Sequence, residues 1–266
     1  MTHSFGRRLG EDGLESENIT NLRLLSVAVD KLTNHIVMAA LWMHFLTGRP
    51  GSDPPDRQPE WVKWGFVLTW LPKTALTQTT NPPSGPVATY TVTMIVFQPP
   101  GEIFKDIVRF VNSSSWADAT VDPYILVDIT LVSWYRLVDK IAWEATKLIL
   151  ADEKDIFRRA QMLRSTSEST VTDLDLHRIH TNTKNAVFMI EALDAAIRLV
   201  GAVLSDHEMY GQRGNRVWEN THRRLRHRSE LFHSTRLRTV SSQGRIKNTV
   251  DLVRHQHPTS SFSDLS

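Results

Sequence analysis

About half of the chain, from Asp122 to about His257, carries the apolar spacing of long helices, and this limits the available folds most. Asp122-Pro123 predicts a helix start, because Asp is a good N-cap and Pro suits the first helical position. Apolar residues then recur every three or four positions in three stretches, with breaks at Ser165–Thr170 and Met209–Asn215. Helices of roughly 35–40 residues are on the order of 55 Å long. We therefore expect an elongated antiparallel bundle rather than a compact globule.

The region before Asp122 shows a mixed pattern. Apolar positions that step by three and four predict a helix over residues 21–46. Trp61–Trp70 is aromatic and β-branched, and Val87–Phe97 alternates apolar side chains with threonines, so both segments predict strands. A short helix is expected after Pro99-Pro100.

These elements predict an α+β fold: a small β-sheet with flanking helices, followed by an elongated antiparallel bundle of three long helices. We divide the chain into a disordered tail (1–20), an α/β N-terminal domain (21–121), a long-helix bundle or stalk (122–257) and a polar tail (258–266). Seven large aromatics are expected in the core rather than in a ligand cage. They are Trp61, Trp64, Trp70, Trp116, Trp134, Tyr135 and Trp143.

Composition and motifs narrow the function classes. The chain has no cysteine, which excludes disulfides and thiolate chemistry and favours the cytosol. Its longest apolar run, Ile36–Leu46, is far shorter than the roughly 20 residues of a transmembrane helix, so we expect no membrane span. No phosphate-binding loop, nucleophile elbow or zinc-protease motif is present, and we expect no enzyme activity.

A candidate metal site lies at the start of the second long helix. Asp173, Asp175, His177 and His180 are spaced so that one helix face offers carboxylate and imidazole groups to a divalent ion. The alternative is that the acidic residues complement the helix dipole and that the histidines are exposed to solvent.

A candidate anion-binding site lies in the third long helix. From Glu208 to Ser266 the chain has 11 Lys and Arg against 5 Asp and Glu, and Arg223, Arg224, Arg226 and Arg228 form the densest run. This run suits phosphate groups of an anionic membrane surface or of nucleic acid. It has few interleaved aromatics, which makes nucleic acid the weaker partner. The alternative is a solvated helix face that pairs with the acidic body of the protein.

Two stretches resemble the CorA-like magnesium transporter family, including its fungal members. Leu174–Ile197 is similar to that family's helix with a Leu-His start and small apolar residues. Leu231–Gln256 is similar to the family's stalk helix, with Asn248 and Gln256 at its polar positions. The resemblance covers roughly residues 120–257, and the family's Gly-Met-Asn signature is absent from the sequence.

The resemblance implies a cytosolic α/β domain with long stalk helices that assemble around an axis. We therefore expect a CorA-like protein related to Mg²⁺ transporters that lacks the pore and does not transport alone. Mg²⁺ is the ion that the resemblance implies, the long helices are the expected contacts of a homo-oligomer, and the membrane surface is a further expected partner. The alternatives are a helical scaffold for protein–protein interactions and a basic helix that binds anionic lipid or RNA.

Overall fold

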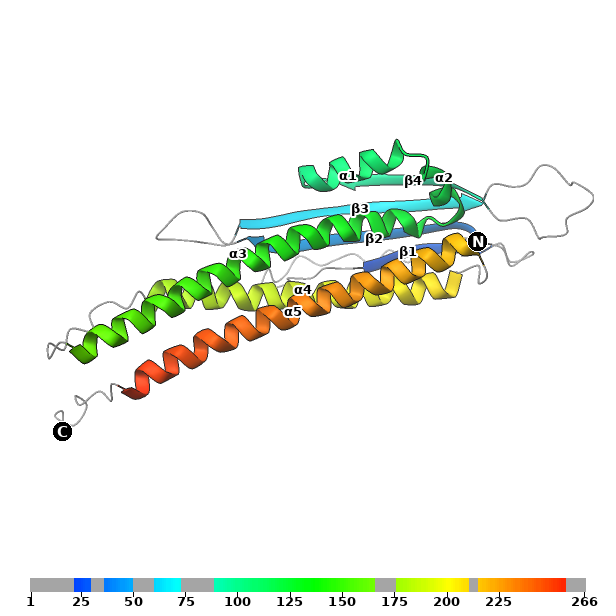
Figure 1. Cartoon of the computed structure of the whole chain (residues 1–266). Helices are drawn as coiled ribbons and strands as arrows, with labels where there is room; N and C mark the ends of the chain where they lie inside the picture. The colour runs from blue at the N-terminus through cyan, green and yellow to red at the C-terminus, as the bar shows by residue number, and fades with distance from the viewer. Residues whose placement is uncertain are drawn as a thin grey trace, which may run out of the picture.

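The computed structural model describes residues 22–29, 36–49, 60–72, 89–165, 176–210 and 215–256. Figure 1 shows an antiparallel sheet that lies along one half of a long helical bundle. The predicted fold class is confirmed: an α+β protein with a small sheet, flanking helices and three long helices. The two predicted tails lie outside the described residues.

Four described strands form the sheet in the order β1-β2-β3-β4, and each is antiparallel to the next. The central pair β2–β3 keeps an unbroken register, from Ala39 opposite Trp70 to Arg49 opposite Glu60. Pairing of β1 with β2 is less regular and shifts register twice. The strands are β1 (Leu22–Val29), β2 (Ile36–Arg49), β3 (Glu60–Pro72) and β4 (Tyr90–Phe97).

The helix predicted over residues 21–46 is wrong, because this segment contains β1 and most of β2. Leu41, Met43 and Phe45 of β2 are all fully buried, which is the period of two that a strand requires. A continuous apolar run does not distinguish a buried strand from a buried helix by its periodicity. The segment is a strand because β2 forms backbone hydrogen bonds with β1 on one side and β3 on the other.

The two predicted strands and the short helix after the proline pair are confirmed as β3, β4 and α1 (Gly101–Val111). In β4, Tyr90, Val92, Met94 and Val96 are half-buried and Thr91 and Thr93 are exposed, as the alternation predicts. A further helix, α2 (Trp116–Val121), was not predicted, because six residues are too few to show a helical period.

Three long helices follow: α3 (Tyr124–Ser165), α4 (Leu176–Tyr210) and α5 (Arg216–Gln256). Figure 1 shows that α4 runs antiparallel to its two neighbours, so that α3 and α5 run parallel to each other. At about 1.5 Å per residue, α3 and α5 are each about 60 Å long, which fits the predicted elongated bundle. Among the described residues, no helix combines the length and the apolar character needed to cross a lipid bilayer.

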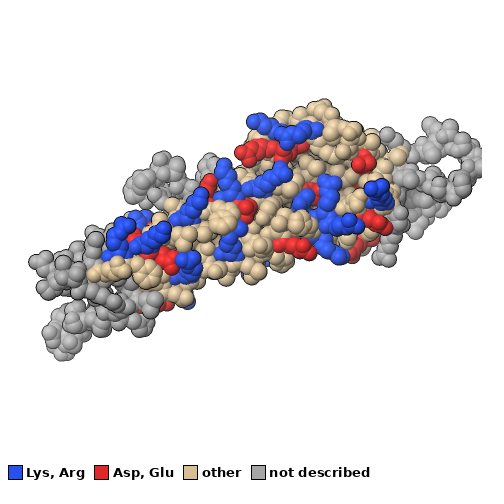
Figure 2. Space-filling view, in the orientation of Figure 1, with Lys and Arg blue, Asp and Glu red and all other residues tan. Residues whose placement is uncertain are grey.

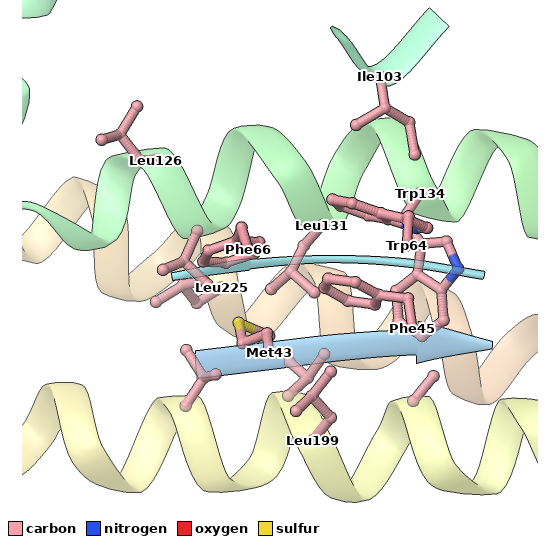
Figure 3. Close-up of a cluster of buried hydrophobic side chains, with 14 of the residues drawn as sticks. Met43, Phe45, Trp64, Phe66, Ile103, Leu126, Leu131, Trp134, Leu199 and Leu225 are labelled. Carbon is pink, nitrogen blue, oxygen red and sulfur yellow. The ribbon is translucent and has the colours of Figure 1, made fainter. Parts of the chain in front are cut away.

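The main core lies where the sheet covers the bundle. In Figure 3 side chains of β2, β3, α1, α3, α4 and α5 meet in one cluster. Phe45 is at its centre: its ring stacks on Trp64 at 4.1 Å and meets the edge of Trp134 at 4.5 Å. Trp64, Trp70 and Trp134 are buried as predicted, whereas Trp143 is 47% exposed on α3.

Beyond the sheet, the described residues of the bundle form a small second cluster. Its buried members are Ile149, Ile156, Ile179, Ala186 and Ile246. We call this part of the molecule the distal end, and the part under the sheet the sheet end.

Candidate functional site

The predicted metal site is only partly within the described structure. Asp173 and Asp175 lie outside the described residues, and His177 lies in the first turn of α4, where its side chain is not described. His180 is exposed on α4. Among the described residues, no group of three or more His, Asp and Glu side chains is placed to hold a metal ion. The site at Asp173, Asp175, His177 and His180 stays a prediction.

His180 lines an open groove between α4 and α5 at the distal end. The groove has a volume of about 700 Å³. Its walls combine the aliphatic residues Ile179, Val240, Ile246 and Val250 with the polar residues Thr183, Gln243, Lys247 and Asp251.

The predicted anion-binding run is divided by the structure. Arg223 and Arg226 are exposed on α5. Arg224 and Arg228 instead contact one carboxylate, that of Asp128 on α3, with Nε–O distances of 2.7 and 2.8 Å. Asp128 is fully buried and holds both guanidinium groups against the bundle, while the side chain of Arg224 stays 46% exposed and that of Arg228 is 15% exposed.

Similar pairs continue along α5. Arg236 binds Asp194 of α4, while Arg238 and Arg245 bind Asp139 and Glu153 of α3. The basic face of α5 therefore pairs extensively with acidic residues of the bundle.

A second polar cluster lies at the sheet end, where the ends of the three long helices meet. The Nε2 atom of His207 on α4 lies 3.1 Å from Oδ2 of Asp122, which precedes α3. Its Nδ1 atom lies 3.3 Å from Nδ1 of His222 on α5. The Nε2 atom of His222 lies 3.4 Å from Oε1 of Glu208. We call these four residues the histidine junction.

Aromatic groups enclose the histidine junction. Trp218 stacks on His207 and His222 with centroid distances of 4.9 and 5.2 Å, and its Nε1 donates to the carbonyl oxygen of His207. Asp122 also accepts a hydrogen bond from the backbone N–H of Tyr124 through its other carboxylate oxygen. The side chains of His207 and Asp122 are 1% and 5% exposed, whereas that of Glu208 is 55% exposed, so the junction extends from the protein interior to the surface.

The junction contains a chain of groups that share protons. If His207 donates to Asp122, its Nδ1 accepts from Nδ1 of His222, because two N–H groups facing each other at 3.3 Å would repel. Burial is the main cause that lowers the pKa of His222 below its ordinary value of 6.5; the charge of Arg226 acts in the same direction and the carboxylate of Glu208 acts against it. At neutral pH His222 is therefore mainly uncharged.

Sequence reasoning identified Asp122 as a helix cap but missed His207 and His222. His207 lies four residues after Val203, on the apolar face of α4, and this spacing is the signal that predicts burial. The contact with His222 depends on the packing of α4 against α5, which no local pattern gives.

No protein-family model and no curated protein sequence matches this chain.

Proposed function

We propose that this chain forms the cytosolic body of a CorA-like protein related to divalent-cation transport, with no enzymatic activity. Two observations support the proposal. Leu174–Ile197 and Leu231–Gln256 resemble elements of that family, and α4 and α5 contain most of these two stretches. The arrangement of a sheet against three long helices, of which α5 has 41 residues, fits a domain with a stalk.

The proposal concerns the body of such a protein and not its pore, because the printed sequence contains no Gly-Met-Asn motif. In this proposal the body binds Mg²⁺ through Asp173, Asp175, His177 and His180 and self-associates through its long helices. Ion binding then controls assembly, since a divalent ion bound to one assembly state shifts the equilibrium toward that state.

Sedimentation velocity of the full chain in Mg²⁺ and in chelator tests the proposal. We expect a larger species in Mg²⁺, and we expect D173N/D175N to abolish the difference. The matched control is E191Q/E230Q, which removes two exposed carboxylates from α4 and α5 outside the predicted site. A monomer that is indifferent to Mg²⁺, or an equal loss in the control, would contradict the proposal.

The transcript downstream of the Ser266 codon provides an independent test. We expect an open reading frame there that encodes two apolar stretches of about 20 residues, the first of which ends in Gly-Met-Asn. A transcript that stops at that codon excludes transport by this product and leaves the scaffold function below.

A specific surface favours a second candidate function, a scaffold for protein–protein interactions. Phe104, Val108 and Val111 of α1 are spaced by four and three residues and are 53%, 40% and 43% exposed. Exposed apolar stripes of this kind mark interaction sites. This function predicts that the protein forms a complex in chelator and that F104S/V108S abolishes the complex. A complex of the same size in F104S/V108S as in the wild type would contradict this function.

A further inference from the structure

The outward face of α3 has an unusual composition. All of its acidic residues are buried or half-buried, and none of the exposed described residues of α3 is acidic. Five of these residues are cationic and two are large aromatics. They are Arg136, Lys140, Trp143, Lys147, Ala151, Lys154, Phe157, Arg158 and Gln161.

The five cations lie on one straight line. They are separated by four, seven, seven and four residues, which places them within about 40° of each other around the helix. The line is on the opposite side of α3 from buried residues such as Ala145, Ile149 and Ile156. It is about 33 Å long at 1.5 Å per residue. Figure 2 shows Lys and Arg side chains distributed along the long axis of the molecule, with Asp and Glu side chains among them.

The charge of this line is mostly uncompensated. Lys140, Lys147, Lys154 and Arg158 form no ion pair with a described residue, and Arg136 alone pairs with Asp106 at 3.2 Å. Four acidic side chains of α3 bind neighbouring helices instead: Asp139 and Glu153 bind arginines of α5, and Asp152 and Asp155 bind Arg178 of α4. Glu144 is half-buried one turn from Lys140 and Lys147. A solvated face of mixed sign would not show this separation of charges.

Two exposed aromatics accompany the cations. Trp143 and Phe157 are 47% and 46% exposed, beside Lys140, Lys147 and Lys154 along the same side of the helix. The guanidinium of Arg238 covers the ring of Trp143 at 4.2 Å and holds it in place. Aromatic rings beside cations are the composition of helix faces that lie at a lipid–water interface.

From this arrangement we infer that the outward face of α3 docks on an anionic membrane surface. A straight, rigid row of cations about 33 Å long matches a flat layer of phosphate groups, with which every cation can make contact at once. The backbone of a nucleic acid curves away from a straight row, and two aromatics about 21 Å apart form no stacking platform for bases. The surface is distinct from the predicted run on α5, where Arg224 and Arg228 are bound to Asp128.

Co-sedimentation of the full chain with vesicles tests the inference. The probes are vesicles of phosphatidylcholine alone and with about 30% phosphatidylserine, at low salt. We expect binding to the anionic vesicles only, and we expect K140Q/K147Q/K154Q to weaken it about 100-fold, at about 1 kcal/mol per cation near the surface. Gln preserves helix propensity at these exposed positions, and circular dichroism checks that the variant is folded.

The matched control is R216Q/R223Q/R226Q, which removes three exposed cations from α5 and leaves α3 unchanged. It should retain most of the binding. The inference is overturned if the wild type does not prefer anionic vesicles, if the α3 variant binds as the wild type does, or if the α5 control loses as much binding. It is also overturned if a single-stranded RNA probe binds the wild-type protein more tightly than the vesicles and loses its affinity in the α3 variant.

Discussion

At the scale of single residues, Asp128 has the most demanding environment, because its fully buried carboxylate contacts two guanidinium groups. Arg224 is 46% exposed, whereas Arg228 is 15% exposed and depends more on this partner. Removal of one member of a buried ion pair leaves charges without compensation.

We expect D128N to lower the free energy of unfolding by about 3 kcal/mol, measured by urea denaturation with circular dichroism. The control is R109Q. The side chain of Arg109 is 77% exposed and pairs with Asp106, so its loss should lower the free energy of unfolding by less than about 1 kcal/mol. If D128N costs no more than R109Q, the contacts of Asp128 do not stabilise the bundle.

The histidine junction predicts a pH dependence of stability. Burial lowers the pKa of His222 in the folded state below 6.5, and the opposing charge of Glu208 does not reverse this, so the unfolded chain binds the proton more readily. Stability then falls as the pH drops below about 6.5, because protonation favours the unfolded state, and the loss ends below the folded pKa. We expect H222Q to reduce the change in the free energy of unfolding between pH 7 and 5, measured by urea denaturation at each pH. H233Q, on the exposed side of α5, should leave this change as in the wild type.

At the scale of elements, a helix or strand is predictable where its own residues carry the signal and is not predictable where distant residues impose it. The bundle helices were predictable because their apolar periodicity extends over more than 30 residues each and because Asp122 marks a start. Strand β2 was missed because Ile36–Leu46 contains good helix formers and its strand conformation is imposed by β1 and β3. Pairs such as His207 with His222 are formed by tertiary packing alone.

Glycine within the long helices provides a prediction at this scale. Gly201 of α4 and Gly244 of α5 have open space where a Cβ atom would be. Ala in the interior of a helix is about 1 kcal/mol more favourable than Gly. We expect G201A and G244A each to raise the midpoint of thermal unfolding, measured by circular dichroism. G101A, at the first residue of α1, should have a smaller effect, and equal shifts in all three variants would contradict this explanation.

At the scale of the whole molecule, the uneven distribution of apolar packing predicts uneven local stability. The main cluster joins the sheet to all three long helices at the sheet end, whereas the distal cluster has five buried members among the described residues. Regions with little apolar burial open at low free energy. In hydrogen exchange we expect amides of residues 149–158 and 179–186 to exchange faster than those of residues 125–142 and 193–203. Uniform protection along the helices would contradict this expectation.

The parallel course of α3 and α5 has a mechanical consequence. The arginines of α5 bind α3 residues that lie 92 to 100 positions earlier in the chain, so the pairs follow one another at nearly constant register along both helices. A force that pulls the distal end of α5 away from the sheet end loads these pairs in shear and all together, whereas unzipping would break them one at a time. The pairs therefore resist sliding of α5 along α3, and a slip of one helical turn, about 5.4 Å, would break those of Arg238 and Arg245 at once, because no acidic side chain lies one turn from their partners on α3.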